Sequence, residues 1–237
     1  MTDQKVAVVT GGARGIGKAI CDAFREKGFI VCTIDLLDND YYIGDIADEK
    51  TLVDFSEKVL SEYGKIDYLI NNACLSKGGL FECSYEDFNY VLRVGVSAPF
   101  MLAKLFMNYF NKGGSIVNIA SSRYLMSQSD TESYSAAKGG IVSLTHAMAV
   151  TLAGKVRVNA ISPGWIDTEE SEFSEEDKKQ HPVERVGVPE DIVHAVLFLI
   201  DEKSSFITGE NIMVDGGMTK LMIYHEDKGW TYNPYEN

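Results

Sequence analysis

The chemistry of this sequence begins with the stretch SYSAAKGG, in which Tyr134 precedes Lys138 by four residues. In a helix, residues at this spacing lie on one face, so the phenol and the ammonium can approach each other. A free phenol has a pKa of about 10 and is a poor base at neutral pH. A nearby positive charge favours the phenolate and lowers that pKa by roughly 1–3 units. The pair therefore predicts a phenol that exchanges protons with an alcohol, although a single Y-x-x-x-K also arises by chance.

A glycine-rich turn, TGGARGIG, offers a place for a second reactant. Gly11, Gly15 and Gly17 lie between a short β-branched run and a helical pattern. Glycines allow a tight turn and a close approach of backbone to a pyrophosphate, and the helix N-terminus offers unpaired N–H groups to the anion. The spacing differs from the common G-x-G-x-x-G fingerprint, and a plain strand–helix turn is the alternative. Three glycines in this position favour a dinucleotide site.

Asp35 indicates which dinucleotide binds. It ends the second apolar run, about 20 residues beyond the glycines, where an acidic side chain hydrogen-bonds the adenosine ribose. A carboxylate there also repels the 2′-phosphate of NADP, so the sequence predicts NAD, with NADP the less favoured cofactor. Arg14 argues in the other direction, because a guanidinium in the glycine turn can pair with a phosphate. Asp35 outweighs it because the acid would lie at the ribose itself.

The segments around these residues alternate between strand and helix patterns. The strand patterns are continuous apolar runs, which are typical of a parallel sheet buried on both faces. Repeated strand–helix units with short connections predict an α/β fold, a doubly wound parallel sheet of about seven strands with helices on both faces. The clearest strand patterns are 5–10, 29–35, 66–72, 114–121, 155–162 and 210–217, and the helix patterns are 15–28, 49–63, 84–110, 132–152 and 189–200.

No linker, low-complexity segment or repeat divides the chain, so we expect residues 1–237 to form one domain. Two segments have no assigned element. Residues 167–189 are acidic and irregular and are expected to form a loop over the substrate. Residues 218–237 form a tail with four aromatic side chains, which either packs at a subunit contact or ends in disorder. Those aromatic residues are Tyr224, Trp230, Tyr232 and Tyr235.

Composition excludes several classes of function. The formal net charge is −13, with no basic cluster, so a nucleic-acid partner is not expected. The four cysteines show neither zinc nor redox spacing, and no metal site is expected. No secretory signal and no apolar run long enough to cross a bilayer is present, which favours the cytoplasm and no membrane partner.

Six motifs together resemble one family, the short-chain dehydrogenases/reductases, whose members have a Rossmann-type dinucleotide-binding fold. The resemblance runs from Lys5 to about Met218. Each motif is modest alone, but all six occur in the family's order and spacing. They are TGGARGIG, NNA at 71–73, NIASS at 118–122, YSAAK at 134–138, NAISPGWIDT at 159–168 and GENIMVDGG at 209–217.

The resemblance implies a role for each matching residue. Tyr134 is the general acid/base, and Ser121, thirteen residues earlier, hydrogen-bonds the substrate oxygen. Lys138 binds the nicotinamide ribose and lowers the pKa of Tyr134. Asn71 and Ala73 resemble the segment that supports the sheet and passes the adenine ribose, and a purely structural role explains Asn71 equally well. The expected cofactor contacts are Gly11, Arg14, Gly15, Ile16, Gly17, Asp35, Asp45, Ile46, Asn72, Ala73, Tyr134, Lys138, the Pro163–Gly164 pair, Ile166 and Thr168.

One residue departs from the family pattern. Gly95, in RVGVSAPF, stands where the family has an asparagine that kinks the helix and helps to hold a water connecting the lysine to solvent. Glycine tolerates a kink but has no amide. We expect a water-filled gap at this position, with activity retained.

The family implies reversible hydride transfer between NAD(H) and a secondary alcohol or ketone, in a homotetramer or homodimer. The substrate pocket is expected at 75–80, at 123–128 and from Trp165 onward. Arg123 there either pairs with a substrate carboxylate or phosphate, or makes a salt bridge or faces solvent. The acidic loop after Thr168 favours a sugar, polyol or other small neutral alcohol. The alternatives are an NADP-dependent 3-oxoacyl-thioester reductase and a non-catalytic NAD-binding sensor or scaffold.

Overall fold

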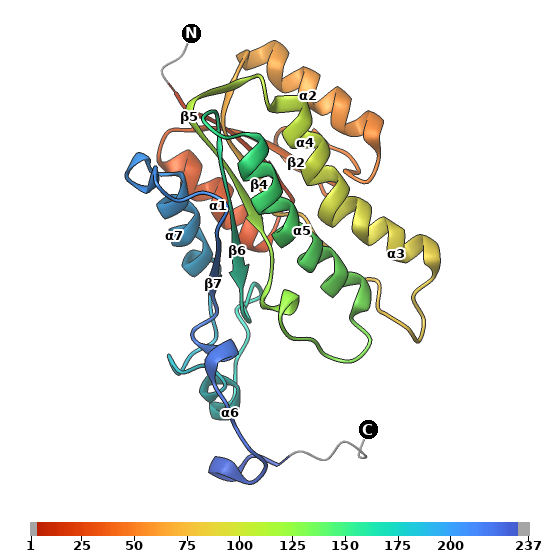
Figure 1. Cartoon of the computed structure of the whole chain (residues 1–237), viewed down its shortest axis with the longest axis vertical. Coiled ribbons are helices and arrows are strands. Elements are labelled where there is room, and N and C mark those ends of the chain that lie inside the picture. The colour runs from red at the N-terminus through yellow and green to blue at the C-terminus, as the bar shows by residue number, and fades with distance from the viewer. Residues whose placement is uncertain (1–3, 232–237) are drawn as a thin grey trace.

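A parallel sheet of seven strands crosses the part of the protein that the computed structural model describes, residues 4–231 (Figure 1). The strand order is β3-β2-β1-β4-β5-β6-β7, and every neighbouring pair is parallel. The sequence prediction of a doubly wound α/β fold is confirmed. The strands are β1 (Val6–Thr10), β2 (Ile30–Asp35), β3 (Tyr42–Ile43), β4 (Ile66–Asn71), β5 (Phe110–Ile119), β6 (Arg157–Pro163) and β7 (Asn211–Val214).

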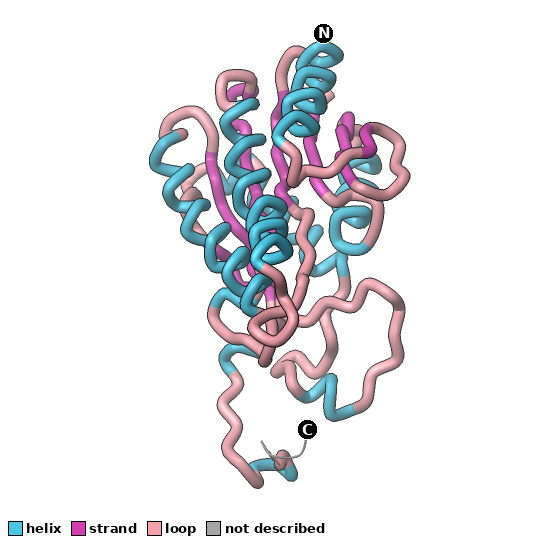
Figure 2. Tube along the Cα trace, turned by 90° about the vertical axis from the view of Figure 1, so that its right-hand side faces the viewer, coloured by secondary structure: helices cyan, strands magenta, loops and turns pink. Residues whose placement is uncertain are grey.

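Helices cover both faces of the sheet, as Figures 1 and 2 show. On one face lie α1 (Gly15–Glu26) and α7 (Pro189–Ile200). The other face carries α2 (Glu49–Tyr63), α4 (Ala98–Phe106) and α5 (Glu132–Thr151). The helix α3 (Tyr85–Leu92) precedes α4, and the short α6 (Glu175–Lys179) lies beyond the carboxyl ends of the strands.

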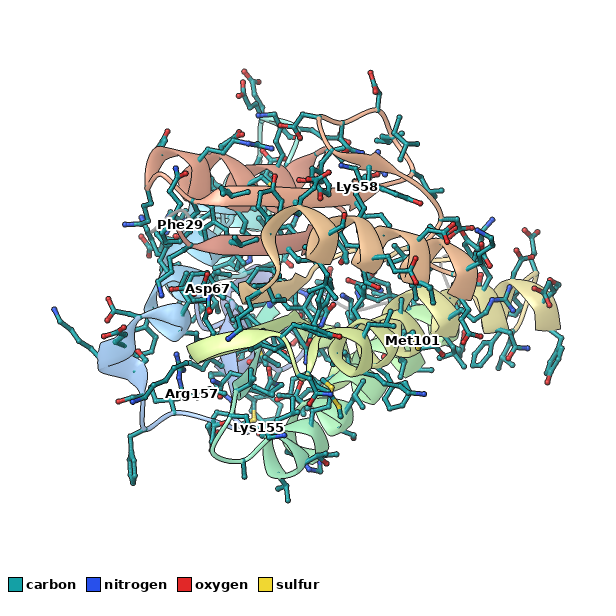
Figure 3. The ribbon with its side chains drawn as sticks, turned by 90° about the horizontal axis from the view of Figure 1, so that it is seen from above. Phe29, Lys58, Asp67, Met101, Lys155 and Arg157 are labelled. Carbon is teal, nitrogen blue, oxygen red and sulfur yellow. The ribbon has the colours of Figure 1, made fainter. Side chains whose placement is uncertain are left out.

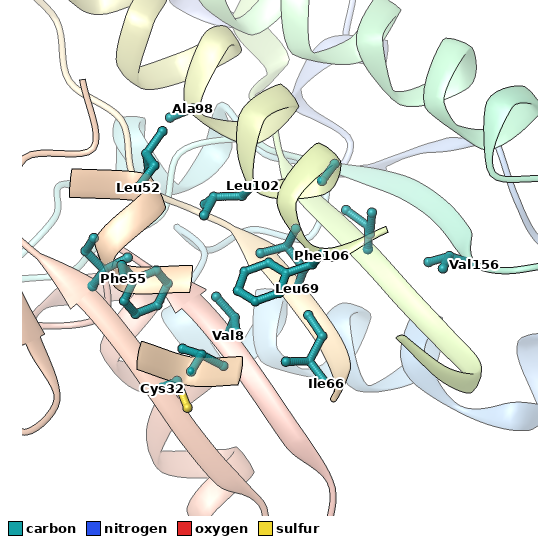
Figure 4. Packing of buried hydrophobic residues seen from close by; sticks show 14 of the residues in the cluster. Val8, Cys32, Leu52, Phe55, Ile66, Leu69, Ala98, Leu102, Phe106 and Val156 are labelled. Carbon is teal, nitrogen blue, oxygen red and sulfur yellow. The ribbon is translucent and has the colours of Figure 1, made fainter. Parts of the chain in front are cut away.

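Alternate residues of β1 contribute to two separate hydrophobic cores, one on each face of the sheet. Val8 points into the core under α2, α4 and α5, where Phe55 and Phe106 are fully buried (Figure 4). Ala7 and Val9 point into the core under α1 and α7. Since both faces of each central strand are buried, the continuous apolar runs of the sequence follow directly.

A polar network lies at the amino ends of the strands, around Asp67, which Figure 3 labels. The carboxylate of Asp67 is 2% exposed. It accepts hydrogen bonds from the Val6 amide at 2.8 Å, the Lys5 ammonium at 3.1 Å and the Asn111 side chain at 3.1 Å. A buried carboxylate needs such partners, so the network ties the starts of β1, β4 and β5 together.

The stretch 84–110, expected to be mostly helical, is divided into three parts. After α3 comes a π-helical turn, Arg93–Ser97, and α4 then ends at Phe106. The chain turns back at Met107–Tyr109, and β5 begins at Phe110. The expected helix was therefore too long at its C-terminal end. The two-residue strand β3 was not expected, because two residues carry no periodic pattern.

The segments that had no assigned element lie together at the carboxyl end of the sheet. Residues 167–189 contain α6, which begins with a capping box between Ser174 and Asp177. The described part of the tail, residues 218–231, extends away from the sheet (Figures 1 and 2). Tyr232 and Tyr235 lie outside the described residues.

Candidate active site

A cleft of about 620 Å³ lies at the carboxyl ends of β1, β2 and β4. The strand order reverses between β1 and β4, and such a switch point is where open α/β sheets bind ligands. Most of the expected cofactor contacts line this cleft. They are Gly11, Arg14, Gly15, Ile16, Gly17, Asp35, Asp45, Ile46, Asn72, Ala73 and Thr168. Tyr134, Lys138, Pro163, Gly164 and Ile166 do not line it.

The glycine turn is built for close backbone contact. Gly11 and Gly15 have positive φ angles, of 68° and 54°. A Cβ atom at Gly17 would lie 2.0 Å from the carbonyl oxygen of Gly11, so a larger residue does not fit. Asn72 holds the turn from the side, because its amide donates to the carbonyl oxygens of Thr10 at 3.0 Å and Gly11 at 2.9 Å. The glycine turn and the N-terminus of α1 together fit a pyrophosphate.

The substitution Gly17→Ala tests this close packing. We expect it to lower the free energy of unfolding by about 3 kcal/mol, because the added methyl group meets backbone that cannot move away cheaply. Gly139→Ala is the matched control, since Gly139 also lies in a helix but has no atom within 4 Å of its Cβ position. It should stabilise the protein by up to about 1 kcal/mol. Chemical denaturation of both variants measures the difference, and equal stabilities would contradict the packing argument.

Asp35 is fixed at the wall of the cleft by two backbone amides. Its Oδ2 accepts from the Ala13 N–H at 3.0 Å, and its Oδ1 accepts from the Leu37 N–H at 2.9 Å. One of these amides belongs to the glycine turn and the other follows β2. The carboxylate therefore links the two segments that border the adenosine end of a dinucleotide.

Tyr90 is a cleft residue that the sequence analysis missed. Its hydroxyl donates to Asp45 Oδ2 at 3.1 Å, and both residues line the cleft. Burial, followed by the neighbouring charge of Asp45, raises the pKa of this phenol. Tyr90 lies in α3, whose sequence contains no motif, so only the fold brings it to the site.

Lys138 and Tyr134 lie on the same side of α5, as their spacing predicts. The Lys138 ammonium is 5.4 Å from the centroid of the Tyr134 ring and donates to the Ile119 carbonyl oxygen at 2.7 Å. The lysine is 3% exposed, so its charge acts through protein rather than through water. Ile119 ends β5, two residues before Ser121. The lysine thus joins the helix of the phenol to the strand that carries the serine.

The Tyr134 phenol has contacts with two further side chains, the Ser121 hydroxyl and the Cys74 thiol. Burial raises the pKa of the phenol, while Lys138 and the hydrogen bond to Ser121 lower it and Cys74 raises it. The prediction that Lys138 lowers the pKa is correct for that one interaction. Burial outweighs the cation, so the pKa of the Tyr134 phenol is raised in this structure.

Asn71 has a structural role. It is 4% exposed, and its amide donates to Asn118 Oδ1 at 2.8 Å. Asn118 in turn donates to the Thr145 hydroxyl at 2.8 Å. This chain of bonds joins β4, β5 and α5 beneath the cleft and contributes no atom to it.

The segment after β6 divides its residues between the cleft and a second cavity. Thr168 reaches the glycine turn, since a Cβ at Gly15 would lie 3.3 Å from its methyl group. Trp165 and Ile166, expected at the substrate and the nicotinamide, instead line a separate cavity of about 260 Å³. Gly164 packs against Asp215, and its N–H donates to the Val214 carbonyl at 3.0 Å. Arg123 donates to the side chain of Gln128 rather than pairing with an acid.

Comparisons with known proteins identify the family to which this fold and sequence belong. A family model described as enoyl-(acyl carrier protein) reductase matches residues 11–219. A short-chain dehydrogenase/reductase from Brucella melitensis, described as a glucose/ribitol dehydrogenase, superposes with a TM-score of 0.83 at 30% identity and covers 92% of this chain and 97% of its own. The chain belongs to the short-chain dehydrogenases/reductases.

Other members of the family are similar over nearly their whole length. An uncharacterized oxidoreductase of Thermotoga maritima is 42% identical, over 95% of this chain and 100% of its own. The 3-oxoacyl-[acyl-carrier-protein] reductase of that organism is 33% identical, over 91% and 98%. The solved apo SCOR enzyme of Clostridium thermocellum has a TM-score of 0.90 at 45% identity, over 98% and 99%. A 4-hydroxyisoleucine dehydrogenase complexed with NADH has a TM-score of 0.84 at 31% identity, over 92% and 100%.

Membership in the short-chain dehydrogenases/reductases makes this protein an NAD(P)-dependent oxidoreductase that acts on CH–OH groups. Within residues 4–231, no helix combines the length and the apolar character needed to cross a bilayer.

Gly95, which departs from the expected family pattern, lies at a close contact between two helices. It lies in the π-helical turn, and a Cβ atom there would be 2.9 Å from the Cβ of Ala137 on α5. A Cβ atom at Gly140 would likewise be 2.9 Å from a methyl group of Val96. The π-helical turn is therefore packed tightly against the helix of Tyr134 and Lys138. A side chain at position 95 would therefore have to displace Ala137 at its first carbon atom.

Proposed function

We propose that this protein oxidises a secondary hydroxyl group of a small neutral polyol or sugar, with NAD as the hydride acceptor. The bound nicotinamide supplies the hydride chemistry, and the protein supplies binding, orientation and proton transfer. The arrangement of Tyr134, Lys138 and Ser121 is the observation that carries the proposal. We further propose that residues 1–237 act as one domain, with 167–189 over the substrate, in a cytoplasmic homotetramer or homodimer.

Each proposed catalytic side chain has one task. The Ser121 hydroxyl, 8% exposed, holds the substrate oxygen close to the phenol. The Tyr134 phenolate accepts the hydroxyl proton during oxidation, and the neutral phenol returns it during reduction. Lys138 stabilises the phenolate through its buried charge. The glycine turn and the N-terminus of α1 would hold the pyrophosphate, and Asp35 the adenosine ribose.

Two features support NAD and a neutral substrate. The Asp35 carboxylate is held at the cleft wall by the Ala13 and Leu37 amides, where it would meet a 2′-phosphate. The loop after Thr168 is acidic, and Glu169 lines the cleft. Asp35 would repel the 2′-phosphate of NADP, and the acidic loop would repel an anionic substrate. The glucose/ribitol dehydrogenase among the similar structures is consistent with a polyol.

The main alternative is reduction of 3-oxoacyl thioesters with NADPH. The similarity to the 3-oxoacyl-[acyl-carrier-protein] reductase of Thermotoga maritima favours it. The formal net charge of −13 and Asp35 argue against it, because an acidic carrier and a 2′-phosphate would both be repelled.

A substrate screen separates these functions. Initial rates are measured with polyols, sugars, hydroxy acids and a 3-oxoacyl thioester, each with the NAD and the NADP cofactor pair. We expect polyol or sugar oxidation with NAD, with kcat/KM at least about tenfold above that with NADP. Faster thioester reduction with NADPH would favour the alternative, and tight NAD binding with no turnover in either direction would favour a sensor.

A further inference from the structure

The dinucleotide cleft follows the ends of three neighbouring strands. The glycine turn comes after β1, Asp35 ends β2, and Asp45 follows the edge strand β3. Neighbouring strands lie about 4.8 Å apart, so these three places form a row at the carboxyl edge of the sheet. A dinucleotide with its pyrophosphate at the glycine turn and its adenosine ribose at Asp35 therefore has its base at Asp45.

The base end of the cleft has an apolar surface and one polar pair. Its lining residues from the β3–α2 connection, α3 and the π-helical turn are Gly44, Asp45, Ile46, Tyr90 and Val94. Ile46 and Val94 are buried and belong to the hydrophobic core under α2, α4 and α5. Such a surface suits the flat face of a purine, so the polar pair, Asp45 and Tyr90, is left to recognise the edge of the base.

Asp45 presents hydrogen-bond acceptors at this end of the cleft. Its Oδ1 accepts from the Ala47 N–H at 2.8 Å, and its Oδ2 accepts from the Tyr90 hydroxyl at 3.1 Å. Each carboxylate oxygen has two lone pairs, so each keeps one that these two bonds do not use. Burial, followed by the charge of Asp45, raises the pKa of the Tyr90 phenol, which therefore stays protonated and donates. The pair thus favours a ligand group that donates a hydrogen bond.

Tyr90 fixes Asp45 from a distant part of the chain. The two residues are 45 positions apart, and their bond joins α3 to the β3–α2 connection. The guanidinium carbon of Arg93 lies 5.7 Å from the centroid of the Tyr90 ring, and the same guanidinium donates to Glu86 at 2.6 Å. These contacts hold the ring in place. Removing the Tyr90 hydroxyl would leave the carboxylate of Asp45 held by the Ala47 bond at Oδ1.

We propose that Tyr90 is a positioning residue that, by holding Asp45, makes the cofactor site selective for a 6-aminopurine over a 6-oxopurine. The 6-amino group of adenine donates to a free lone pair of the Asp45 carboxylate. The 6-oxo group of hypoxanthine would instead place an acceptor against an acceptor. The inference rests on the proposed binding of a dinucleotide in the cleft and on no particular substrate. It applies to NAD and NADP alike, because both carry adenine.

Calorimetric titration with NAD and with nicotinamide hypoxanthine dinucleotide tests the proposal, because these two ligands differ in the base alone. We expect the unmodified protein to bind NAD about tenfold more tightly than the hypoxanthine analogue. Tyr90→Phe keeps the ring and should lower the affinity for NAD by about fivefold, while the affinity for the analogue stays unchanged. Tyr85→Phe, at the exposed start of the same helix, is the matched control and should leave both affinities unchanged.

A double-mutant cycle shows whether Tyr90 acts through Asp45. Asp45→Asn alone should reduce the preference for adenine, because an amide can rotate and donate to the 6-oxo group of hypoxanthine. Adding Tyr90→Phe should then change the preference little, because the residue that Tyr90 positions has already been altered. Additive effects in the double variant would overturn the proposal. So would equal losses of affinity for NAD and the analogue in Tyr90→Phe, since the hydroxyl would then only support the fold.

The measurement needs no turnover, so its outcome is distinct from that of the substrate screen. A protein that prefers NAD to the hypoxanthine analogue but oxidises no polyol would refute the proposed substrate and support this inference. If NADP binds and NAD does not, the proposed choice of NAD is wrong, and the comparison of NADP with its hypoxanthine analogue decides this inference. No preference between the bases in the unmodified protein, or no binding of any dinucleotide, would overturn it without any variant.

Discussion

Tyr134→Phe is expected to reduce kcat for alcohol oxidation by about 10³-fold, within the range that a positioned acid or base contributes. The phenylalanine keeps the ring and its packing against the buried Lys138. It removes the hydroxyl oxygen that, in the proposed mechanism, accepts the substrate proton while Ser121 holds the substrate oxygen. KM for NAD should change little, since Tyr134 does not line the cleft of the dinucleotide contacts.

The matched control is Tyr85→Phe. Tyr85 is 86% exposed at the start of α3, so its hydroxyl should not affect turnover. The rates are followed by the absorbance of reduced nicotinamide, and binding of NAD is measured separately by calorimetry. Oxidation rates in Tyr134→Phe within a few fold of those of the unmodified protein would exclude Tyr134 as the proton carrier.

The pH dependence of the unmodified enzyme gives an independent check. The phenolate needed for oxidation becomes more populated as the pH rises. Because burial raises the pKa of Tyr134, this increase occurs at a higher pH than for a free phenol. The kcat/KM for oxidation should therefore increase with pH toward a plateau, while reduction, which needs the neutral phenol, should show the opposite trend. Tyr134→Phe should lose this dependence along with the rate.

The sequence predicted those features that depend on local spacing. The glycines that let α1 approach β1 could be located because each occupies a fixed place relative to a strand and a helix. The end of α5 and both ends of α7 were also well predicted, because apolar periodicity, Pro189 and a change of composition mark them. The relation of Tyr134 to Lys138 followed from helical geometry alone.

The features that were missed depend on contacts between distant segments. The π-helical turn at Gly95 follows from close packing against Ala137, which no local pattern encodes. Tyr90 reaches the cleft only because α3 lies beside Asp45. The net pKa direction of Tyr134 depends on burial by the whole fold, whereas the sequence revealed only the nearby cation. Trp165 lines the second cavity, and no local pattern in the sequence shows on which side of the backbone its ring lies.

Asp35→Asn is expected to change the ratio of kcat/KM for NAD to that for NADP by about 10²-fold in favour of NADP. The substitution removes a negative charge from the position where the 2′-phosphate would lie, and such like-charge contacts cost several kcal/mol. The asparagine keeps one oxygen that can accept from Ala13 or Leu37, so most of the turn's support remains. Asn is therefore a better test than Ala, which would remove both bonds.

Asp45→Asn is the control that separates charge at the ribose from charge in the cleft. Asp45 also lines the cleft and also accepts a backbone hydrogen bond, from Ala47 at 2.8 Å, in addition to its bond from Tyr90. If repulsion acts only at the ribose, Asp45→Asn lowers kcat/KM for NAD and for NADP to a similar extent. The ratio of the two kcat/KM values then stays unchanged. Equal changes of the ratio in the two variants would mean that the overall negative potential of the cleft, rather than Asp35, selects NAD. An unchanged ratio in Asp35→Asn would leave Arg14 as the residue that decides which dinucleotide is bound.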